Sequence, residues 1–195
     1  MKEIFKTAGK ELQIPFAKLS YHDAMEKYGS DKPDLRYTLQ MQNANDVFKN
    51  TGFKVFKDIL AAGGAIRALR GEKGAAYSRG HLDKLTELVK KNGAKGLVWI
   101  KVKDGKFEGP SVKFFTEEEL KNLQALVLAQ DGDIIFVGSD ANLHTCQTFM
   151  GALRKELVKE LPQLCDWAFV WITNFPLLEY IPEEDRWDAA HNPFT

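Results

Sequence analysis

The order of apolar patterns between residues 53 and 138 constrains the fold of this chain more than any other feature. Apolar and charged residues alternate with a period of two over Phe53–Phe56 and again over Ala65–Arg70. Such alternation is typical of half-buried strands, and Gly63-Gly64 between them suits a tight connection. The pattern therefore predicts a strand hairpin at the start of this region.

A helix and a second pair of strands follow in the sequence. Residues 79–92 carry leucines and valine at helical spacing, and Gly93 stands where such a helix ends. Residues 96–102 and 107–115 are rich in apolar residues on either side of a turn at Asp104-Gly105. The first predicted strand pair is thus followed by a helix, and the second pair leads into the helix described next.

The last third of the region and the residues just after it predict a helix, a strand and a long helix. Thr116 and Glu119 have the spacing of a capping box, which predicts the start of a second helix. Residues 133–138 are almost continuously apolar and predict a buried strand, and residues 141–161 predict a long amphipathic helix. The whole order predicts an α+β fold of two layers, with a mainly antiparallel sheet and helices on one face.

The two flanks of this region have a different character. In the first flank, Ser20 and Gly29 bracket a short helix, and Pro33 fixes the loop that follows. In the second flank, residues 167–172 are continuously apolar, as in a strand that is covered on both faces. We expect that strand to belong to a larger sheet.

Charge is distributed unevenly although the formal net charge of the chain is zero. Residues 53–113 hold 14 basic and 6 acidic side chains, a net charge of +8, and residues 114–195 hold 5 and 14, a net charge of −9. A basic region of this kind suits a polyanion, although lysines also commonly solvate the outer face of a sheet. The lysines concerned are Lys95, Lys101, Lys103 and Lys113.

Composition argues against several other classes of protein. No apolar run approaches the roughly 20 residues that span a bilayer, and the first ten residues lack the apolar core of a signal peptide. The two cysteines, Cys146 and Cys165, form no CxxC pair and have no paired histidines nearby. We expect a cytoplasmic protein with reduced thiols, no membrane association and no metal site.

Three separated stretches resemble one family, the bacterial-type aspartyl-tRNA synthetases. Residues 28–36, Tyr-Gly-Ser-Asp-Lys-Pro-Asp-Leu-Arg, resemble a signature of that family. Residues 93–100 and 109–114 are similar to pieces of its insertion, the GAD domain. Residues 171–177 and 191–195 look like its late strand and histidine loop. The resemblance covers essentially the whole chain, in order.

The resemblance implies a class II synthetase that activates L-aspartate with ATP and Mg²⁺ and transfers it to tRNA(Asp) as a homodimer. It divides the chain into a catalytic-domain segment (1–52), a GAD insertion domain (53–163) and a second catalytic-domain segment (164–195). The flanks would then be partial strands of one catalytic sheet. The arginine and glycine motifs that bind ATP in class II enzymes are not found in this sequence, so we expect the piece itself to be inactive.

Few site residues follow from the resemblance, and none is expected to be catalytic. His191 matches the first histidine of the family loop, which contacts the substrate aspartate, whereas Asn192 replaces the second histidine and Asn174 replaces an aspartate. Lys32 and Arg36 would contact substrate or tRNA, or would only hold the loop through ion pairs with its aspartates. The four lysines named above would face tRNA.

Two other functions are compatible with parts of the sequence. Similar insert domains occur in a subunit of tRNA-dependent amidotransferases, where they recognise tRNA, and an isolated protein-interaction domain would also have an α+β fold. The flanks discriminate between these hypotheses. A borrowed module has no need of both synthetase-like flanks, and an interaction domain predicts that the flanks do not pack beside one another.

Overall fold

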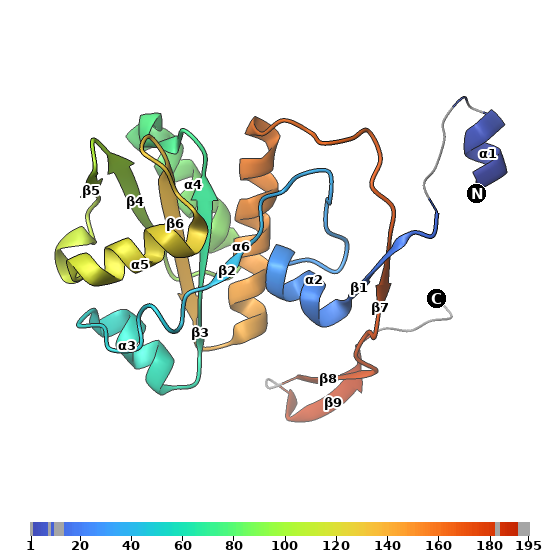
Figure 1. The fold of residues 1–195 in the computed structure, drawn as a ribbon. Coiled ribbons are helices and arrows are strands. Elements are labelled where there is room, and N and C mark those ends of the chain that lie inside the picture. Colours follow the sequence, from blue (N-terminus) through green and yellow to red (C-terminus); the bar gives the residue numbers. More distant parts are fainter. Residues whose placement is uncertain (1, 8, 10–13, 182–183, 191–195) are drawn as a thin grey trace.

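The computed structural model describes residues 2–7, 9, 14–181 and 184–190, and its centre is an antiparallel sheet (Figure 1). The sheet has five strands in the order β2-β3-β6-β4-β5, and every neighbouring pair is antiparallel. The α+β class and the mainly antiparallel sheet are therefore confirmed. In this order the strands are Gln42–Asn43, Ala65–Gly71, Ile134–Asp140, Val98–Lys103 and Lys106–Glu108.

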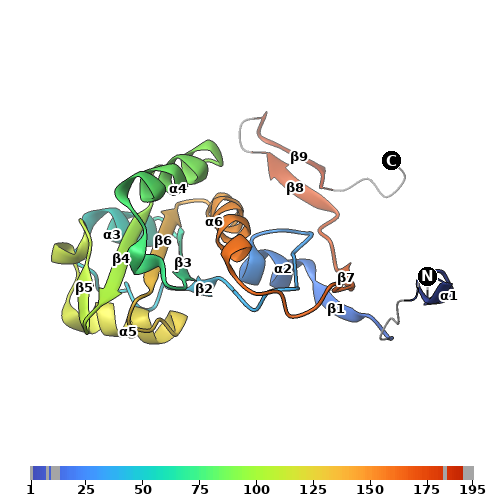
Figure 2. The ribbon, with the colours of Figure 1, turned by 90° about the horizontal axis from the view of Figure 1, so that it is seen from above.

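Helices cover both faces of this sheet, so the expectation that they lie on one face is wrong. Figure 2 shows α4 (Arg79–Lys91) and α6 (Leu143–Leu157) on one side and α5 (Glu117–Val127) on the other. The central strand β6 explains the difference, because all of its apolar side chains are buried. Ile134 and Phe136 join the core beneath α4 and α6, whereas Ile135 and Val137 join the core beneath α5.

The predicted hairpin at residues 53–70 is also wrong. Residues 54–61 form a helix, α3 (Lys54–Ala61), and β3 pairs with β2 and β6 instead. Phe56 is buried, and Phe53 and Leu60 pack against the same core as α5. Apolar residues at this spacing of three and four fit a helix as well as a strand, and a four-residue window cannot separate the two periods.

Other local predictions are confirmed, with one strand shorter than expected. The Thr116 side chain accepts a hydrogen bond from the Glu119 amide while the Glu119 carboxylate accepts one from the Thr116 amide, which completes the capping box. Asp104 and Gly105 have positive φ at the β4–β5 turn. Strand β5 ends at Glu108, and a 3-10 turn, η2 (Val112–Phe114), replaces the rest of the strand expected over 107–115.

The two flanks of the chain meet in a separate pair of parallel strands. β1 (Ala17–Ser20) lies beside β7 (Val170–Thr173), with Ala17 opposite Val170 (Figure 1). Strand β7 leads into a hairpin of β8 (Leu178–Ile181) and β9 (Arg186–Ala189). Trp171 is 58% exposed, so coverage of β7 on both faces is not observed in the described residues, where β1 is its only neighbouring strand.

The first flank is joined to the five-stranded body through α2 (Tyr21–Tyr28), which packs on α6. Backbones touch where the two helices meet: a Cβ atom built on Gly151 would lie 2.2 Å from the Gly29 carbonyl oxygen. Beside this contact, the buried Arg67 of β3 donates to Glu26 of α2 (2.6 Å). The other carboxylate oxygen of Glu26 accepts from the Gln147 amide (2.6 Å).

The remaining short elements are the helix α1 (Lys2–Thr7) and the 3-10 turns η1 (Gly74–Ala76) and η3 (Val158–Glu160). The division of the chain at 52/53 and 163/164 stays a prediction. Residues 42–43 already lie in the five-stranded sheet, and Phe48 is fully buried against α3 and Phe115.

The contact between α2 and α6 gives a stability prediction. Gly151→Ala should lower the free energy of unfolding by about 2–3 kcal/mol, because the added methyl group overlaps backbone that has no room to yield. Urea denaturation followed by circular dichroism measures the change. Gly80→Ala in α4 is the matched control, since nothing lies within 4 Å of the added Cβ there. It should be neutral or stabilising by up to about 1 kcal/mol, and equal effects of the two substitutions would contradict the packing argument.

Candidate functional site

The loop after α2, residues 29–37, is held by an internal ion pair. The Asp34 carboxylate accepts hydrogen bonds from Nε (2.9 Å) and Nη2 (2.7 Å) of Arg36 and from the Arg36 amide (3.0 Å). These bonds, the side-chain ones first, hold the pKa of Asp34 below its ordinary value. The structural interpretation of Arg36 is thus observed, whereas Lys32 is exposed and has no ion pair within the described residues.

Arg154 of α6 anchors this loop to the helix. It is 3% exposed, and its guanidinium donates to the carbonyl oxygens of Leu39 (2.7 Å) and Asp34 (2.9 Å). Its Cζ atom also lies 4.8 Å from the centre of the Tyr28 ring. Burial lowers the pKa of Arg154, but an arginine stays charged at neutral pH. The loop is therefore fixed to the helix by a buried cation.

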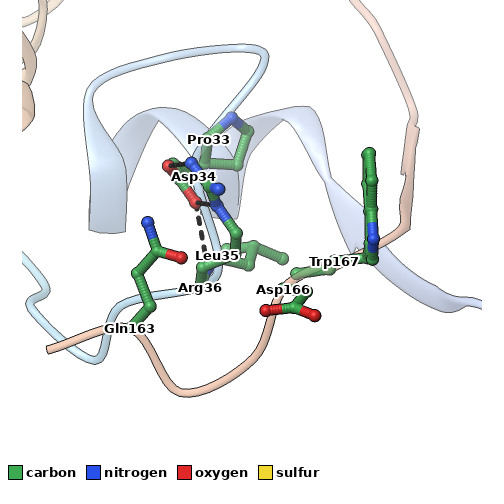
Figure 3. Close-up of a pocket in the computed structure, with 8 residues that line it drawn as sticks. Pro33, Asp34, Leu35, Arg36, Gln163, Asp166 and Trp167 are labelled. Atoms are coloured by element: carbon green, nitrogen blue, oxygen red, sulfur yellow. Dashed lines mark hydrogen bonds and ion pairs between the residues drawn. The ribbon is translucent and has the colours of Figure 1, made fainter.

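A polar cavity of about 620 Å³ lies where the loop meets the segment after α6 (Figure 3). In the close-up, Gln163, Asp166 and Trp167 from that segment lie across from the loop residues Pro33 to Arg36. The two segments also share a backbone bond, since the Leu164 amide donates to the Arg36 carbonyl oxygen (2.9 Å). Both flanks of the chain thus line one cavity.

Two further cavities border the same loop. A groove of about 590 Å³ runs between the loop and the C-terminal half of α6, with Lys32, Arg36, Arg154, Lys155 and Lys159 in its lining. A smaller cavity of about 360 Å³ lies on the other side and is lined by Asp31, His144, Glu179 and Ala190, among others. Burial, followed by the charges of Asp31 and Glu179, raises the pKa of Tyr21 in this cavity. The loop thus separates a basic groove from an acidic cavity.

Two predicted site residues, His191 and Asn192, lie outside the described residues, and their roles stay predictions. Ala190 is the last described residue before them, and it lines the acidic cavity. Asn174, which follows β7, has a φ of 58°. This left-handed conformation is one that Asn and Asp adopt more readily than other non-glycine residues.

The four predicted lysines of the central region are not equivalent. Lys95, Lys103 and Lys113 are exposed. Lys95 precedes β4 and Lys103 ends it, so these two lysines lie at opposite ends of the strand. Lys101 is half-buried and donates through Nζ to the Tyr77 carbonyl oxygen (2.7 Å), so part of its bonding capacity serves the fold. Lys113 lies over the Phe114 ring at 5.1 Å.

The described residues contain no group of three or more His, Cys, Asp or Glu side chains that could hold a metal ion. In the same part of the chain, no helix has both the length and the apolar character needed to cross a bilayer.

The family model of the GAD domain matches residues 56–150, which cover β3 to β6 and most of α6. Beyond this region, the whole chain aligns with aspartate–tRNA ligases. It is 51% identical over 99% of its length to the aspartate–tRNA(Asp/Asn) ligase of Elusimicrobium minutum, and 46% identical over 98% to the aspartate–tRNA ligase of Clostridium tetani. The chain is homologous to bacterial aspartate–tRNA ligases.

The match is to part of each ligase only. The chain spans about a third of the length of its curated relatives: 34% of the Elusimicrobium protein and 33% of the Clostridium protein. A related aspartate–tRNA(Asp/Asn) ligase from Aquifex aeolicus is 46% identical over 96% of the chain. A hypothetical protein of Pyrococcus horikoshii shares part of the shape (TM-score 0.36, 19% identity, half of each chain), too little to support an argument.

Homology to the ligases covers both flanks as well as the GAD domain. Residues outside 56–150 include the loop 29–37, both strands of the parallel pair and the β8–β9 hairpin. The amidotransferase alternative has less support, because it accounts for the insertion only. The interaction-domain alternative predicts separated flanks, and β1 and β7 lie side by side instead.

Sequence reasoning missed Arg154, the residue that positions the loop. A signal was present, because Arg154 follows Met150 by four residues and precedes Leu157 by three, on the apolar side of α6. A basic residue at an inward-facing helical position must find buried acceptors. Its partners are two backbone carbonyl groups, which no side-chain pattern reveals.

Arg154→Met gives a test of this anchor. The substitution keeps a long side chain but leaves the carbonyl groups of Asp34 and Leu39 without their donor, so the free energy of unfolding should fall by about 2–4 kcal/mol. Hydrogen exchange of the amides in residues 34–39 should become faster. Lys155→Met, at the exposed neighbouring position, should change stability by less than about 0.5 kcal/mol. Unchanged exchange in the Arg154 variant would show that the loop holds itself.

Proposed function

We propose that this chain works as part of an aspartate–tRNA ligase, with a GAD insertion set into its catalytic domain. The observation that carries the proposal is the identity of 51% over 99% of the chain, flanks included. The parallel pairing of β1 with β7 supports it, because two halves of an interrupted domain should rejoin beside the insertion. In this proposal, the sheet begun by β1 and β7 is the catalytic sheet.

The whole ligase would activate L-aspartate with ATP and Mg²⁺ and transfer it to tRNA(Asp), as a cytoplasmic homodimer. His191 would donate a hydrogen bond to a carboxylate of the aspartate, more strongly when the imidazole is protonated. Mg²⁺ bound with ATP is held by phosphate oxygens, water and one or two carboxylates, and it would neutralise charge on the phosphates. We expect those carboxylates in the part of the ligase that this chain does not span.

This division of roles predicts that the 195-residue chain is inactive by itself. It should show no aspartate-dependent exchange of pyrophosphate into ATP, because the arginine and glycine motifs that bind ATP in class II enzymes are not found in its sequence. The full-length Clostridium tetani aspartate–tRNA ligase, a relative by sequence, serves as the positive control. Exchange by the chain that is abolished by His191→Ala would overturn the division.

The insertion would contribute a surface for tRNA. On the β4–β5 hairpin, Lys103 and Lys106 stand directly opposite each other across the two strands, and both are exposed. Like charges in this position repel, so the pair is destabilising unless an anion lies over it. Lys95 precedes β4 and lies at the opposite end of that strand, so it is not part of this pair. We call Lys103 and Lys106 the hairpin lysines.

Binding of an unmodified tRNA(Asp) transcript should therefore be weak and sensitive to salt. Replacing Lys103 and Lys106 together by Gln should lower the affinity about tenfold at 50 mM KCl, and should make the slope of log K against log [KCl] shallower by about 1–2. Filter binding at 50–200 mM KCl measures both quantities. Binding that does not depend on salt would contradict a polyanion-facing surface.

A further inference from the structure

The basic groove between the loop 29–37 and α6 stands apart from the rest of the molecule in its charge. Six charged residues line it, and five of them are basic. The one acidic residue, Asp34, is already paired with Arg36. In a chain whose formal net charge is zero, this groove is therefore a local concentration of positive charge.

The cations of the groove are incompletely neutralised. Lys32 and Lys155 are exposed and make no ion pair within the described residues. Lys159 has only an exposed partner three residues away, Glu156, and such pairs contribute little. Arg154 is buried and bonds to carbonyl oxygens, with no carboxylate at ion-pair distance in the described part of the chain. The charge of Asp34 acts on Arg154 from beyond that distance and is shared with Arg36, so the lining of the groove supplies one carboxylate for five cations.

The dipole of α6 accounts for only part of the positive charge in the groove. Basic residues near the C-terminal end of a helix are favoured by its dipole, which suits Arg154 and Lys155 on α6. Lys32 comes from a different segment, the loop after α2, and is not part of α6. The groove therefore gathers cations from two elements, and the contact of Gly29 with Gly151 fixes those elements against each other.

The aromatic rings in the groove each lie beside an arginine. Tyr28 has one face occupied by the Arg154 guanidinium, and the Tyr37 hydroxyl accepts a hydrogen bond from the Gln163 side chain (3.0 Å). The Arg36 guanidinium lies 5.9 Å from the Tyr37 ring centre. A guanidinium thus already lies beside each ring, and the free donors of the groove are the ammonium groups of its lysines, which suit phosphate oxygens.

We propose that this groove binds the sugar–phosphate backbone of an RNA strand, at a site separate from the hairpin lysines. The choice of RNA rests on the proposed function, while the anionic character of the ligand follows from the groove itself. Lys32 and Lys155 contact phosphate oxygens directly. Arg154 acts as a positioning residue, because it holds the loop that presents Lys32.

The experiment compares three double variants that each remove two positive charges from the 195-residue chain, and it measures their binding to the tRNA(Asp) transcript. The groove variant is Lys32→Gln with Lys155→Gln, and the hairpin variant is Lys103→Gln with Lys106→Gln. The control is Lys54→Gln with Lys121→Gln, which removes the same charge from exposed positions on α3 and α5, across the sheet from α6. All substituted positions are exposed, and thermal melting checks that each variant is folded.

The groove variant should bind about tenfold more weakly at 50 mM KCl, with a shallower salt slope, and the control should bind as the unaltered chain does. Lys32→Arg with Lys155→Arg should retain binding, because the contact needs charge rather than one side-chain shape. The groove proposal is overturned if the groove variant binds tRNA(Asp) as tightly as the control does. If the hairpin variant binds more weakly in the same experiment, the proposed function still stands. No binding by the unaltered chain at 50 mM KCl overturns both.

Discussion

The contact between α2 and α6 determines how the parts of this chain are arranged. At this point the backbones of Gly29 and Gly151 touch, and no side chain larger than hydrogen fits between them. The buried Arg67 of the sheet and Gln147 of α6 both bond to Glu26 of α2, which ties the same junction together with charge-assisted bonds. The loop 29–37, the groove and the neighbouring cavities all take their shape from this junction. Helix α6 therefore belongs to two bodies, because one side covers the insertion sheet and the other supports the flank.

Local capping chemistry made several elements predictable from the sequence. Ser20, Thr116 and Glu119 have side chains that bond to nearby amides, and such contacts depend on a few consecutive residues only. The buried strand at 134–140 was recognisable from continuous apolar character. The helix at 54–61 was not, because its apolar residues satisfy both periods over a short window. The placement of helices on both faces of the sheet was not predictable, because it depends on contacts between residues that are far apart in the sequence.

The candidate site shows the same limit. An ion pair within the loop was one of two alternatives that the sequence left open for Arg36, and the pairing with Asp34 is observed. The role of Arg154 was not foreseen, since its acceptors are carbonyl groups 115 and 120 residues earlier in the chain. The family resemblance was carried by short stretches in the flanks and the insertion, and homology to the ligases over nearly the full length confirms it.

The parallel pair of β1 and β7 bears on how such a chain reaches its folded state. The register joins Ala17 to Val170, so the pair closes a loop of about 150 residues. Closing a flexible loop of that length costs roughly 4–5 kcal/mol of chain entropy. Once the sheet and α6 have formed, however, α2 and the end of α6 already lie together, and the remaining gap is short. Formation of the five-stranded sheet and α6 before the β1–β7 pair would therefore lower the entropy cost of closing that pair.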